Sequence, residues 1–261
     1  MRLSETDSTA QINYISNDLG RELNLKEVNS ELAAMTTEER ILWAVKTFGT
    51  RAVLLSSMQK SDSVMMHFFY RLGLANEIIL VDTGYHFRET LQLRDIFMLQ
   101  YRLNVVTLYP KQTVEQQEKA TRCKLYQSIE GQTQCCRFRK IMPFISHIKD
   151  SGHKLVMAGV RRSEGDKRAE VNFAVKDKRF DGYTFHPLLD WTDKDIEQYL
   201  TSNNVPVHAL HRQNYPSIGC ECCTTPVDPG EYPRAGRWRH LRETDTSAKY
   251  CGILFADGAG I

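Results

Sequence analysis

The chain has 261 residues, of which 41% are hydrophobic and 25% are charged, as in an ordinary globular protein. Lys and Arg (34) nearly balance Asp and Glu (32), and the net charge of +2 argues against a general nucleic-acid binder. No stretch approaches the roughly 18–20 apolar residues of a membrane span, and the first residues lack the apolar core of a signal peptide. We therefore expect a cytoplasmic protein that binds neither membranes nor nucleic acid.

Seven cysteines are unevenly spaced along the chain. In a cytoplasmic protein they are expected to be reduced, metal-bound or catalytic rather than joined in disulfides.

The chain is interpreted as one domain with appendages, because it contains no internal repeat, low-complexity tract or Gly/Ser linker. We expect an N-terminal helical extension at residues 1–40, an α/β domain at 41–240 and a flexible, Gly-rich C-terminal tail at 241–261. Between residues 25 and 48 the apolar positions recur mostly at helical spacing. This predicts two helices, the second capped by Thr36 or Thr37.

A short apolar run at residues 52–55 predicts a buried strand. The polar loop 56–63 follows it, and a helical pattern begins at Val64. Strand, polar loop and helix form the geometry in which free N–H groups at a helix N-terminus receive an anion. The loop has neither a Walker nor a G-x-G-x-x-G pattern, so a plain strand–helix connection with serine caps is the alternative interpretation.

Two further strands and a helix are predicted at residues 77–81, 103–109 and 88–99. Strands that alternate with helices indicate an α/β fold with a doubly wound, mainly parallel sheet, which binds ligands at the carboxyl ends of its strands. Asp82 and Thr83 follow one such strand, and the loop 56–63 follows another. We therefore expect them to share one pocket.

A fourth strand, at residues 154–158, leads into the loop 159–168, which carries three arginines and a lysine. A solvated surface is one interpretation, but the position at a strand's carboxyl end favours a phosphate or sulfate clamp, since guanidinium groups pair with oxyanions in bidentate fashion. Downstream, Asp190 or Thr192 is expected to cap a helix that ends before Pro206. The region 111–134 is polar, and its Cys123 is expected to be a partly buried thiol without function.

Five of the cysteines lie in two clusters, one of which contains a C-x-x-C pattern. That pattern, Cys220 to Cys223, is shared by zinc sites, iron–sulfur sites and redox dithiols. Cys135 and Cys136 are adjacent, which suits different irons of one cluster better than a tetrahedral zinc ion. An iron–sulfur cluster is therefore favoured, zinc and no metal are the alternatives, and Cys222 is expected to point away from the metal.

Cys251 stands alone in the C-terminal tail. A cysteine nucleophile needs positive charge near it, because the thiolate is the reactive form. Lys249 is close in sequence, and the arginines would add to it if the tail folds over the pocket. The alternative is a free thiol in a mobile tail.

Together these motifs resemble the assimilatory sulfonucleotide reductases, the family of adenylyl-sulfate and 3′-phosphoadenylyl-sulfate reductases, over nearly the whole chain from residue 40. The most specific segments occur in the family's order, at residues 81–87, 159–162 with Arg168, 186–192, and 215–220 continuing to 234–238. The resemblance implies a sheet similar to that of adenine nucleotide α-hydrolases.

The resemblance also implies a set of site residues. A [4Fe–4S] cluster, which Lys140 links electrostatically to the substrate, would be held by Cys135, Cys136, Cys220 and Cys223. The catalytic cysteine corresponds to Cys251, although the family's usual Glu-Cys-Gly-Leu-His is Tyr-Cys-Gly-Ile-Leu here. The nucleotide and its sulfate would be held by Ser56, Ser57, Asp62, Ser63, Asp82, Thr83, Gly159, Arg161, Arg162, Arg168, Arg234 and Arg237.

The implied activity is the reduction of adenylyl sulfate in sulfate assimilation and cysteine biosynthesis. The Cys251 thiolate would attack the substrate's sulfur and release AMP, and a reduced thioredoxin or glutaredoxin-like protein would then release sulfite from the Cys251 S-sulfonate. One alternative is a reductase of the 3′-phosphorylated nucleotide or of both nucleotides. Another is a metal-bound sulfur-relay or binding module without activity, and homo-oligomerisation is left open.

Overall fold

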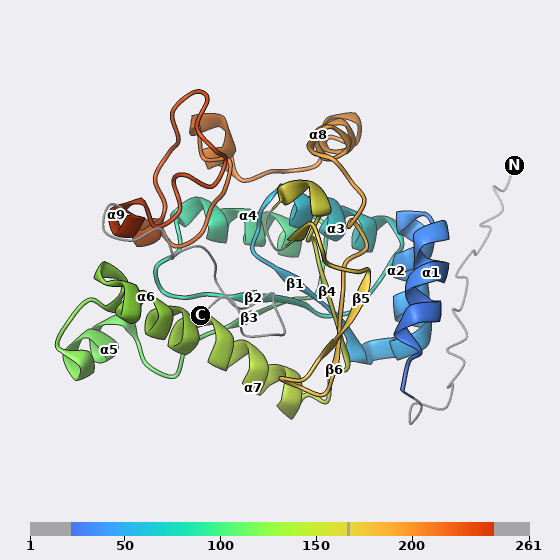
Figure 1. Ribbon diagram of the computed structural model, residues 1–261, viewed down its shortest axis with the longest axis horizontal. Coiled ribbons are helices and arrows are strands. Elements are labelled where there is room, and N and C mark those ends of the chain that lie inside the picture. The colour runs from blue at the N-terminus through green and yellow to red at the C-terminus, as the bar shows by residue number, and fades with distance from the viewer. Residues whose placement is uncertain (1–21, 166–167, 243–261) are drawn as a thin grey trace, which may run out of the picture.

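The computed structural model describes residues 22–165 and 168–242, and within these ranges a six-stranded sheet forms the centre of the molecule (Figure 1). The strand order is β3-β2-β1-β4-β6-β5, in which β5 runs antiparallel to β6 and every other neighbouring pair is parallel. The strands are β1 Ala52–Ser56, β2 Ile78–Val81, β3 Val105–Leu108, β4 Leu155–Ala158, β5 Ala174–Asp177 and β6 Gly182–Phe185.

Helices cover both faces of this sheet (Figure 1). Successive strand residues point to opposite faces, so Leu54 packs in the larger core with α2, α3, α4 and α8, whereas Val53 packs in a second core with α7. The helices are α1 Leu25–Ala34, α2 Thr37–Phe48, α3 Lys60–Arg71, α4 Arg88–Leu99, α5 Val114–Thr121, α6 Ile129–Cys136, α7 Met142–Asp150, α8 Asp193–Ser202 and α9 Arg239–Arg242. Within the described ranges, none of these helices has the length and apolar character needed to span a bilayer.

The side of the sheet on which the chain adds new strands changes at β1. The chain goes from β1 to β2 and β3 on one side, then returns to place β4 on the other side of β1. In such sheets a crevice opens at the carboxyl ends of the two strands that flank the reversal. Here those ends are Ser56 and Ala158, which locates the expected ligand site.

Several predictions from the sequence are confirmed. The sheet is mainly parallel with helices on both faces, as the alternating pattern predicted. Thr36 caps α2, because its hydroxyl accepts a bond from the backbone of Glu39 while the Glu39 carboxylate bonds back to Thr36. The helix predicted at residues 88–99 is α4, and Thr192 caps α8 in the same reciprocal manner.

Other boundaries were predicted wrongly. The loop 56–63 is shorter than expected, because α3 begins at Lys60 with Gln59 and Asp62 forming a capping box. The polar region 111–134 contains α5 and most of α6. The expected boundary at residue 40 falls inside α2, whose buried residues belong to the same core as the sheet.

The outer edge of the sheet is covered at one point by a side chain of α1. The amide of Asn29 donates a hydrogen bond to the carbonyl of Ala174 (2.9 Å) and accepts one from its N–H (2.8 Å). The Asn29 side chain therefore satisfies the outward-facing N–H and carbonyl of Ala174, the first residue of β5.

Candidate active site

A cavity of about 640 Å³ opens at the carboxyl ends of β1 and β4, where the sheet topology places it. This volume lies in the usual range for small-molecule sites, which is about 300–1,000 Å³. Of the residues predicted to bind a ligand, those that line the cavity are Ser56, Ser57, Asp62, Lys140, Gly159, Arg161, Arg168, Arg234 and Arg237.

The first turn of α3 is organised around the carboxylate of Asp62. One of its oxygens accepts hydrogen bonds from the backbone N–H of Ser57 (2.7 Å), the Ser57 hydroxyl (2.8 Å) and the N–H of Gln59 (3.3 Å). Burial raises the pKa of Asp62 to about 6, although the bonds from Ser57 favour the charged form. The donors that the sequence predicted for an anion are therefore partly occupied by the protein's own carboxyl group.

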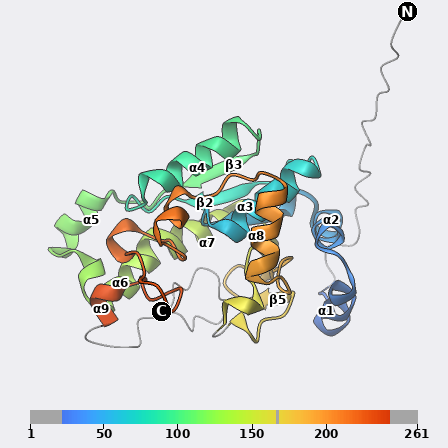
Figure 2. The same ribbon diagram turned by 90° about the horizontal axis from the view of Figure 1, so that it is seen from above.

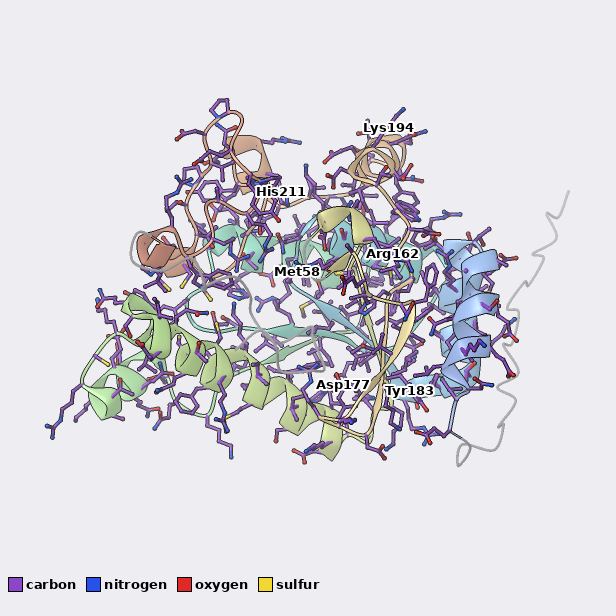
Figure 3. All side chains as sticks on the ribbon, in the orientation of Figure 1. Met58, Arg162, Asp177, Tyr183, Lys194 and His211 are labelled. Carbon is purple, nitrogen blue, oxygen red and sulfur yellow. The ribbon has the colours of Figure 1, made fainter. Side chains whose placement is uncertain are left out.

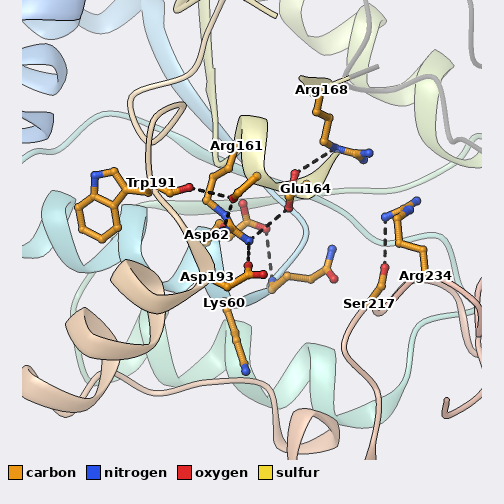
Figure 4. A network of polar contacts seen from close by, with 12 residues as sticks. Lys60, Asp62, Arg161, Glu164, Arg168, Trp191, Asp193, Ser217 and Arg234 are labelled. Carbon is orange, nitrogen blue, oxygen red and sulfur yellow. Dashed lines mark hydrogen bonds and ion pairs between the residues drawn. The ribbon is translucent and has the colours of Figure 1, made fainter. Parts of the chain in front are cut away.

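The basic loop after β4 forms a network with nearby acids (Figure 4). A terminal nitrogen of Arg161 lies 2.7 Å from the Asp193 carboxylate, and its Nε donates to the hydroxyl of Ser61 (3.1 Å). Arg168 pairs with Glu164 at 3.0 Å. These ion pairs hold the two buried guanidinium groups in place at the cavity wall and offset part of their charge.

Arg234 lies beside Ser217 on the other side of the network (Figure 4), and Arg237 also lines the cavity. Each donates a hydrogen bond to the Ser217 hydroxyl, at 3.2 and 3.3 Å, and Arg237 also donates to the carbonyl of Ile218 (3.0 Å). Burial lowers the pKa of Arg234 to about 10, and the positive charges of Arg237 and Arg168 add to the effect. An anion bound here would relieve this repulsion and accept directional hydrogen bonds.

Arg162 was predicted to bind the ligand but does not line the cavity. The Arg162 side chain (labelled in Figure 3) is exposed, donates to the carbonyl of Val171 (3.3 Å) and packs 5.6 Å from the ring centre of Phe173. Ser63 is likewise displaced from the predicted site, since it is fully buried inside α3. Neither side chain is placed to touch a molecule in the cavity.

Asp82 and Thr83, which follow β2, do not line this cavity, so the expectation that they share one pocket with the loop 56–63 is wrong. The Asp82 carboxylate accepts a bond from the N–H of Gly84 (2.9 Å) and lines neither the cavity nor the neighbouring pocket. Thr83 is buried, and its hydroxyl lies 3.3 Å from the sulfur of Cys220. Thr83 therefore belongs to a second pocket, formed by cysteines.

This second pocket, called here the cysteine pocket, is lined by Cys135, Cys136, Cys220, Cys222 and Cys223. The first two end α6, and the other three come from a segment that lies beside α6 in both views (Figures 1 and 2). A backbone bridge between His86 and Cys220 joins this segment to the loop after β2. A π-helical turn, Arg137–Ile141, follows α6 and directs Lys140 into the pocket.

Cys222 lies with the other cysteines, and its expected orientation away from a metal stays a prediction. Its sulfur lies 3.7 Å from that of Cys223 and within the cysteine pocket. This contact lowers the pKa of Cys223, an effect to which the charge of Lys140 adds, and raises the pKa of Cys222, which burial raises further. Burial and the sulfurs of Cys220 and Cys223 raise the pKa of Cys135 to about 11, so several thiolates in this pocket need added positive charge.

The spacing of the sulfurs distinguishes between metal groups. Zinc–sulfur bonds of about 2.3 Å in a tetrahedron bring sulfurs within roughly 3.8 Å of one another. Among the residues that the structure describes, no three of the pocket's sulfurs lie within 4.8 Å of one another. Within the described part of the chain, the pocket's sulfurs are therefore not arranged as a closed tetrahedral zinc site.

The sequence matches the phosphoadenosine phosphosulfate reductase domain over residues 51–226, more than half of the chain. The chain belongs to this family. Its relatives include the adenosine 5'-phosphosulfate reductase of Mycolicibacterium smegmatis, which is 34% identical over 224 residues (86% of this chain, 90% of the relative). Adenosine 5'-phosphosulfate reductase 1 of Bacillus subtilis is 35% identical over 212 residues (81% and 87%).

Solved structures agree on the fold of this reductase-family chain. The phosphoadenylyl-sulfate reductase of Candida auris has a TM-score of 0.68 at 21% identity and covers 78% of this chain and 96% of its own. An FMN adenylyltransferase of Candida glabrata has a TM-score of 0.52 at 16% identity, covering 80% and 69%. The sheet is therefore of the adenine-nucleotide-enzyme type that the sequence predicted.

Two further aspects of the reductase-family site concern the predicted residues. Ser217, which holds both Arg234 and Arg237, was not predicted, although it stands in the segment 215–220 that carried part of the resemblance. Cys251 and the rest of the predicted tail beyond Arg242 lie outside the described residues. Cys123 lies within them and is exposed, not partly buried as expected.

Proposed function

We propose that this chain reduces adenylyl sulfate to sulfite and AMP in cytoplasmic sulfate assimilation and cysteine biosynthesis. The observation that carries the proposal is that Lys140 and Arg237 line both the large cavity and the cysteine pocket. Two cations thus stand between a site for an anionic nucleotide and a site for a metal group. The curated relatives support the same substrate, because those described above are named adenosine 5'-phosphosulfate reductases.

The substrate is an acid anhydride of phosphate and sulfate and carries negative charge at both groups. Arg234 and Arg237 would bind these oxygens from one side and Arg168 from the other. As the bond to the leaving phosphate oxygen breaks, negative charge grows there, and fixed guanidinium groups stabilise it without reorganising. Arg161, which is held by Asp193 and Ser61, would keep the cavity wall next to α3 in place.

The cysteine pocket would hold a [4Fe–4S] cluster through Cys135, Cys136, Cys220 and Cys223. When bound, this group would supply a fixed charged centre that shapes the neighbouring site, and it need not change its oxidation state. The gathering of these four cysteines in one pocket that Lys140 also lines supports it. Arg139 holds the wall of the cysteine pocket in place, because it is buried and donates hydrogen bonds to the carbonyl of Thr83 and the side-chain oxygen of Gln117.

The chemical step would belong to Cys251. Its thiolate attacks the sulfate sulfur of the bound nucleotide, the sulfur–oxygen bond to the phosphate breaks, and AMP leaves with the electron pair. The product is a Cys251 S-sulfonate. A reduced dithiol protein of the thioredoxin or glutaredoxin type then attacks the Cys251 sulfur and releases sulfite, and its second thiol frees Cys251 while the partner is oxidised to a disulfide.

A Cys251→Ser substitution tests this proposal. We expect no sulfite from adenylyl sulfate and no protein-bound sulfonate by intact-protein mass spectrometry, because the nucleophile is gone. Cys123→Ser is the matched control, since Cys123 is exposed and distant in sequence from every predicted site residue, and it should keep full activity. If Cys251→Ser forms sulfite at the normal rate, or if the unaltered protein forms none, the reductase proposal fails.

A second candidate substrate is 3′-phosphoadenylyl sulfate, which is favoured by the name of the matching domain. Comparing kcat/KM for the two nucleotides decides between them. We expect adenylyl sulfate to be preferred, in keeping with the names of the curated relatives. Preference for the 3′-phosphorylated nucleotide would overturn the substrate assignment while leaving the reaction class intact.

The cofactor is tested by composition. Protein purified without air should be brown and contain about four irons and four sulfides per chain. A colourless protein that contains zinc in place of iron would contradict the cluster.

A further inference from the structure

A group of three metal-ligating side chains lies at the opposite edge of the sheet from the active site. Glu77 directly precedes β2, His153 lies shortly before β4, and His147 stands in the last turn of α7. Because β2 and β4 are parallel to β1, their starts share the amino-terminal edge, away from the cavity at the carboxyl ends. Nothing proposed for the reductase reaction uses these residues.

The three side chains converge on one point. The Nε2 atom of His147 lies 2.5 Å from one carboxylate oxygen of Glu77, and the Nε2 atom of His153 lies 3.8 Å from the other. Their ligand atoms all lie within 4.8 Å of one another, and among the residues described no other set of three His, Cys, Asp or Glu side chains does so. Three such atoms from three different elements form a preorganised set, unlike a run of acidic residues on one surface helix.

His153 provides a second and independent indication of a ligand. Its side chain is 8% exposed, yet its Nε2 atom has no hydrogen-bond partner and is too far from Glu77 for a hydrogen bond. Leaving a buried polar atom unsatisfied costs free energy, so it indicates a missing partner.

We propose that Glu77, His147 and His153 bind a divalent transition-metal ion of the zinc type. Two imidazoles and a carboxylate are a known three-ligand set for zinc, with water in the fourth position. With metal–ligand bonds of about 2.1 Å, the ligand atoms of a tetrahedral site lie about 3.4 Å apart. The two separations from Glu77, 2.5 and 3.8 Å, are within about 1 Å of that value, and the two histidine nitrogens lie within 4.8 Å of each other, so side-chain adjustment would complete the site.

The ion would join the end of α7 to the starts of β2 and β4. His147 and Glu77 are 22% and 19% exposed, which leaves the fourth position open to water. In this assignment the ion ties these three elements together, and the proposal can be tested independently of the reaction proposed above.

Titration of the untagged protein with Zn²⁺ tests the site. We expect one equivalent to bind, and its affinity to fall by about 100-fold or more in His147→Gln and in Glu77→Gln, because even the loss of an outer-shell partner costs about 10–100-fold. Asp150→Asn is the matched control: Asp150 is an exposed carboxylate three residues after His147, and its substitution should leave the affinity unchanged. Circular dichroism confirms that each variant is folded.

Titration with Co²⁺ separates this site from the cysteine pocket. Metal held by imidazole and carboxylate gives ligand-field bands without a thiolate-to-cobalt charge-transfer band, and we expect such bands to disappear in the His147→Gln variant. The proposal is overturned if Zn²⁺ does not bind, if the two variants bind it as tightly as the unaltered protein, or if the whole cobalt signal is the thiolate band.

Discussion

Arg234 lies among like charges, with Ser217 as its hydrogen-bond partner and Arg237 and Arg168 nearby. Charge-assisted hydrogen bonds contribute about 1.5–3 kcal/mol, so Arg234→Ala should raise the KM for the nucleotide about 10- to 100-fold. Arg162→Ala removes an arginine that is also in the family motif but packs on Phe173 outside the cavity, and it should change KM less than about twofold. Steady-state kinetics of both variants check this, and equal effects would contradict the described geometry.

Cys222 is a fifth thiol in a pocket that needs four for a cluster. We expect Cys222→Ala to keep the iron and sulfide content of the unaltered protein. Cys220→Ala should lose most of it, because Cys220 is buried and fixed by the bridge to His86. Iron and sulfide analysis of proteins purified without air measures both. Loss of iron in Cys222→Ala alone would show that Cys222 is a ligand.

At this scale the residue types of the site could be predicted, but the directions of their side chains could not. Arg161 and Arg162 are adjacent in a basic loop, and both were assigned to the ligand. Arg161 has an extended backbone (φ −131°, ψ 144°), in which successive side chains point to opposite sides, so only one of the two can face the cavity. The sequence contains both arginines but not this backbone angle.

The contact between the loop after β4 and the start of α3 depends on the absence of a side chain at Gly159. A methyl group there would lie 2.9 Å from the Cβ of Ser61 and 3.0 Å from a carboxylate oxygen of Asp62. Gly159→Ala should therefore cost about 1–3 kcal/mol and raise KM, because the two cavity walls are pushed apart.

Gly165→Ala is the matched control for that substitution. Its added methyl meets nothing within 4 Å, and it carries only the cost of a positive-φ extended backbone (φ +69°, ψ −167°), about 1–3 kcal/mol, with no change in KM. Thermal unfolding and KM of both variants separate stability from binding. An unchanged KM in Gly159→Ala would contradict the close approach.

Elements with strong local signals were predicted well, and those fixed by distant contacts were not. α4 and α8 have clear periodicity or reciprocal caps. β5 and β6 were not predicted, and β5 contains a buried aspartate, Asp177, which is satisfied by Arg179 at 2.6 Å. A charged residue at a buried strand position breaks the pattern from which strands are predicted.

Buried histidines couple the stability of the whole molecule to pH. Burial, with nearby positive charge, lowers the pKa of His86, His186 and His211 to about 4 in the folded protein, against 6.5 as the ordinary value. The unfolded chain therefore binds more protons between pH 4 and 6.5, so their contribution to stability is complete above pH 6.5 and is lost as the pH falls toward 4. Asp62 acts in the opposite direction, since its raised pKa favours the folded state at low pH.

The three histidines together outweigh Asp62, because each histidine contributes up to about 3 kcal/mol to the pH-dependent stability. We expect Tm to fall between pH 7 and 5, and the fall to be smaller in His211→Gln, which removes one of the three titrations. Thermal unfolding followed by circular dichroism at several pH values checks this. A Tm that is constant or rises on acidification would contradict it.

The pairing of Asn29 with Ala174 has a consequence for how copies of this molecule meet. An unprotected outer strand is a template on which another chain can continue the sheet. Here one amide side chain satisfies the donor and the acceptor that such an addition would need first. A continuous sheet that includes Ala174 would require Asn29 to leave it, so α1 opposes addition of a strand at this edge, and we expect loss of α1 to make the edge prone to aggregation.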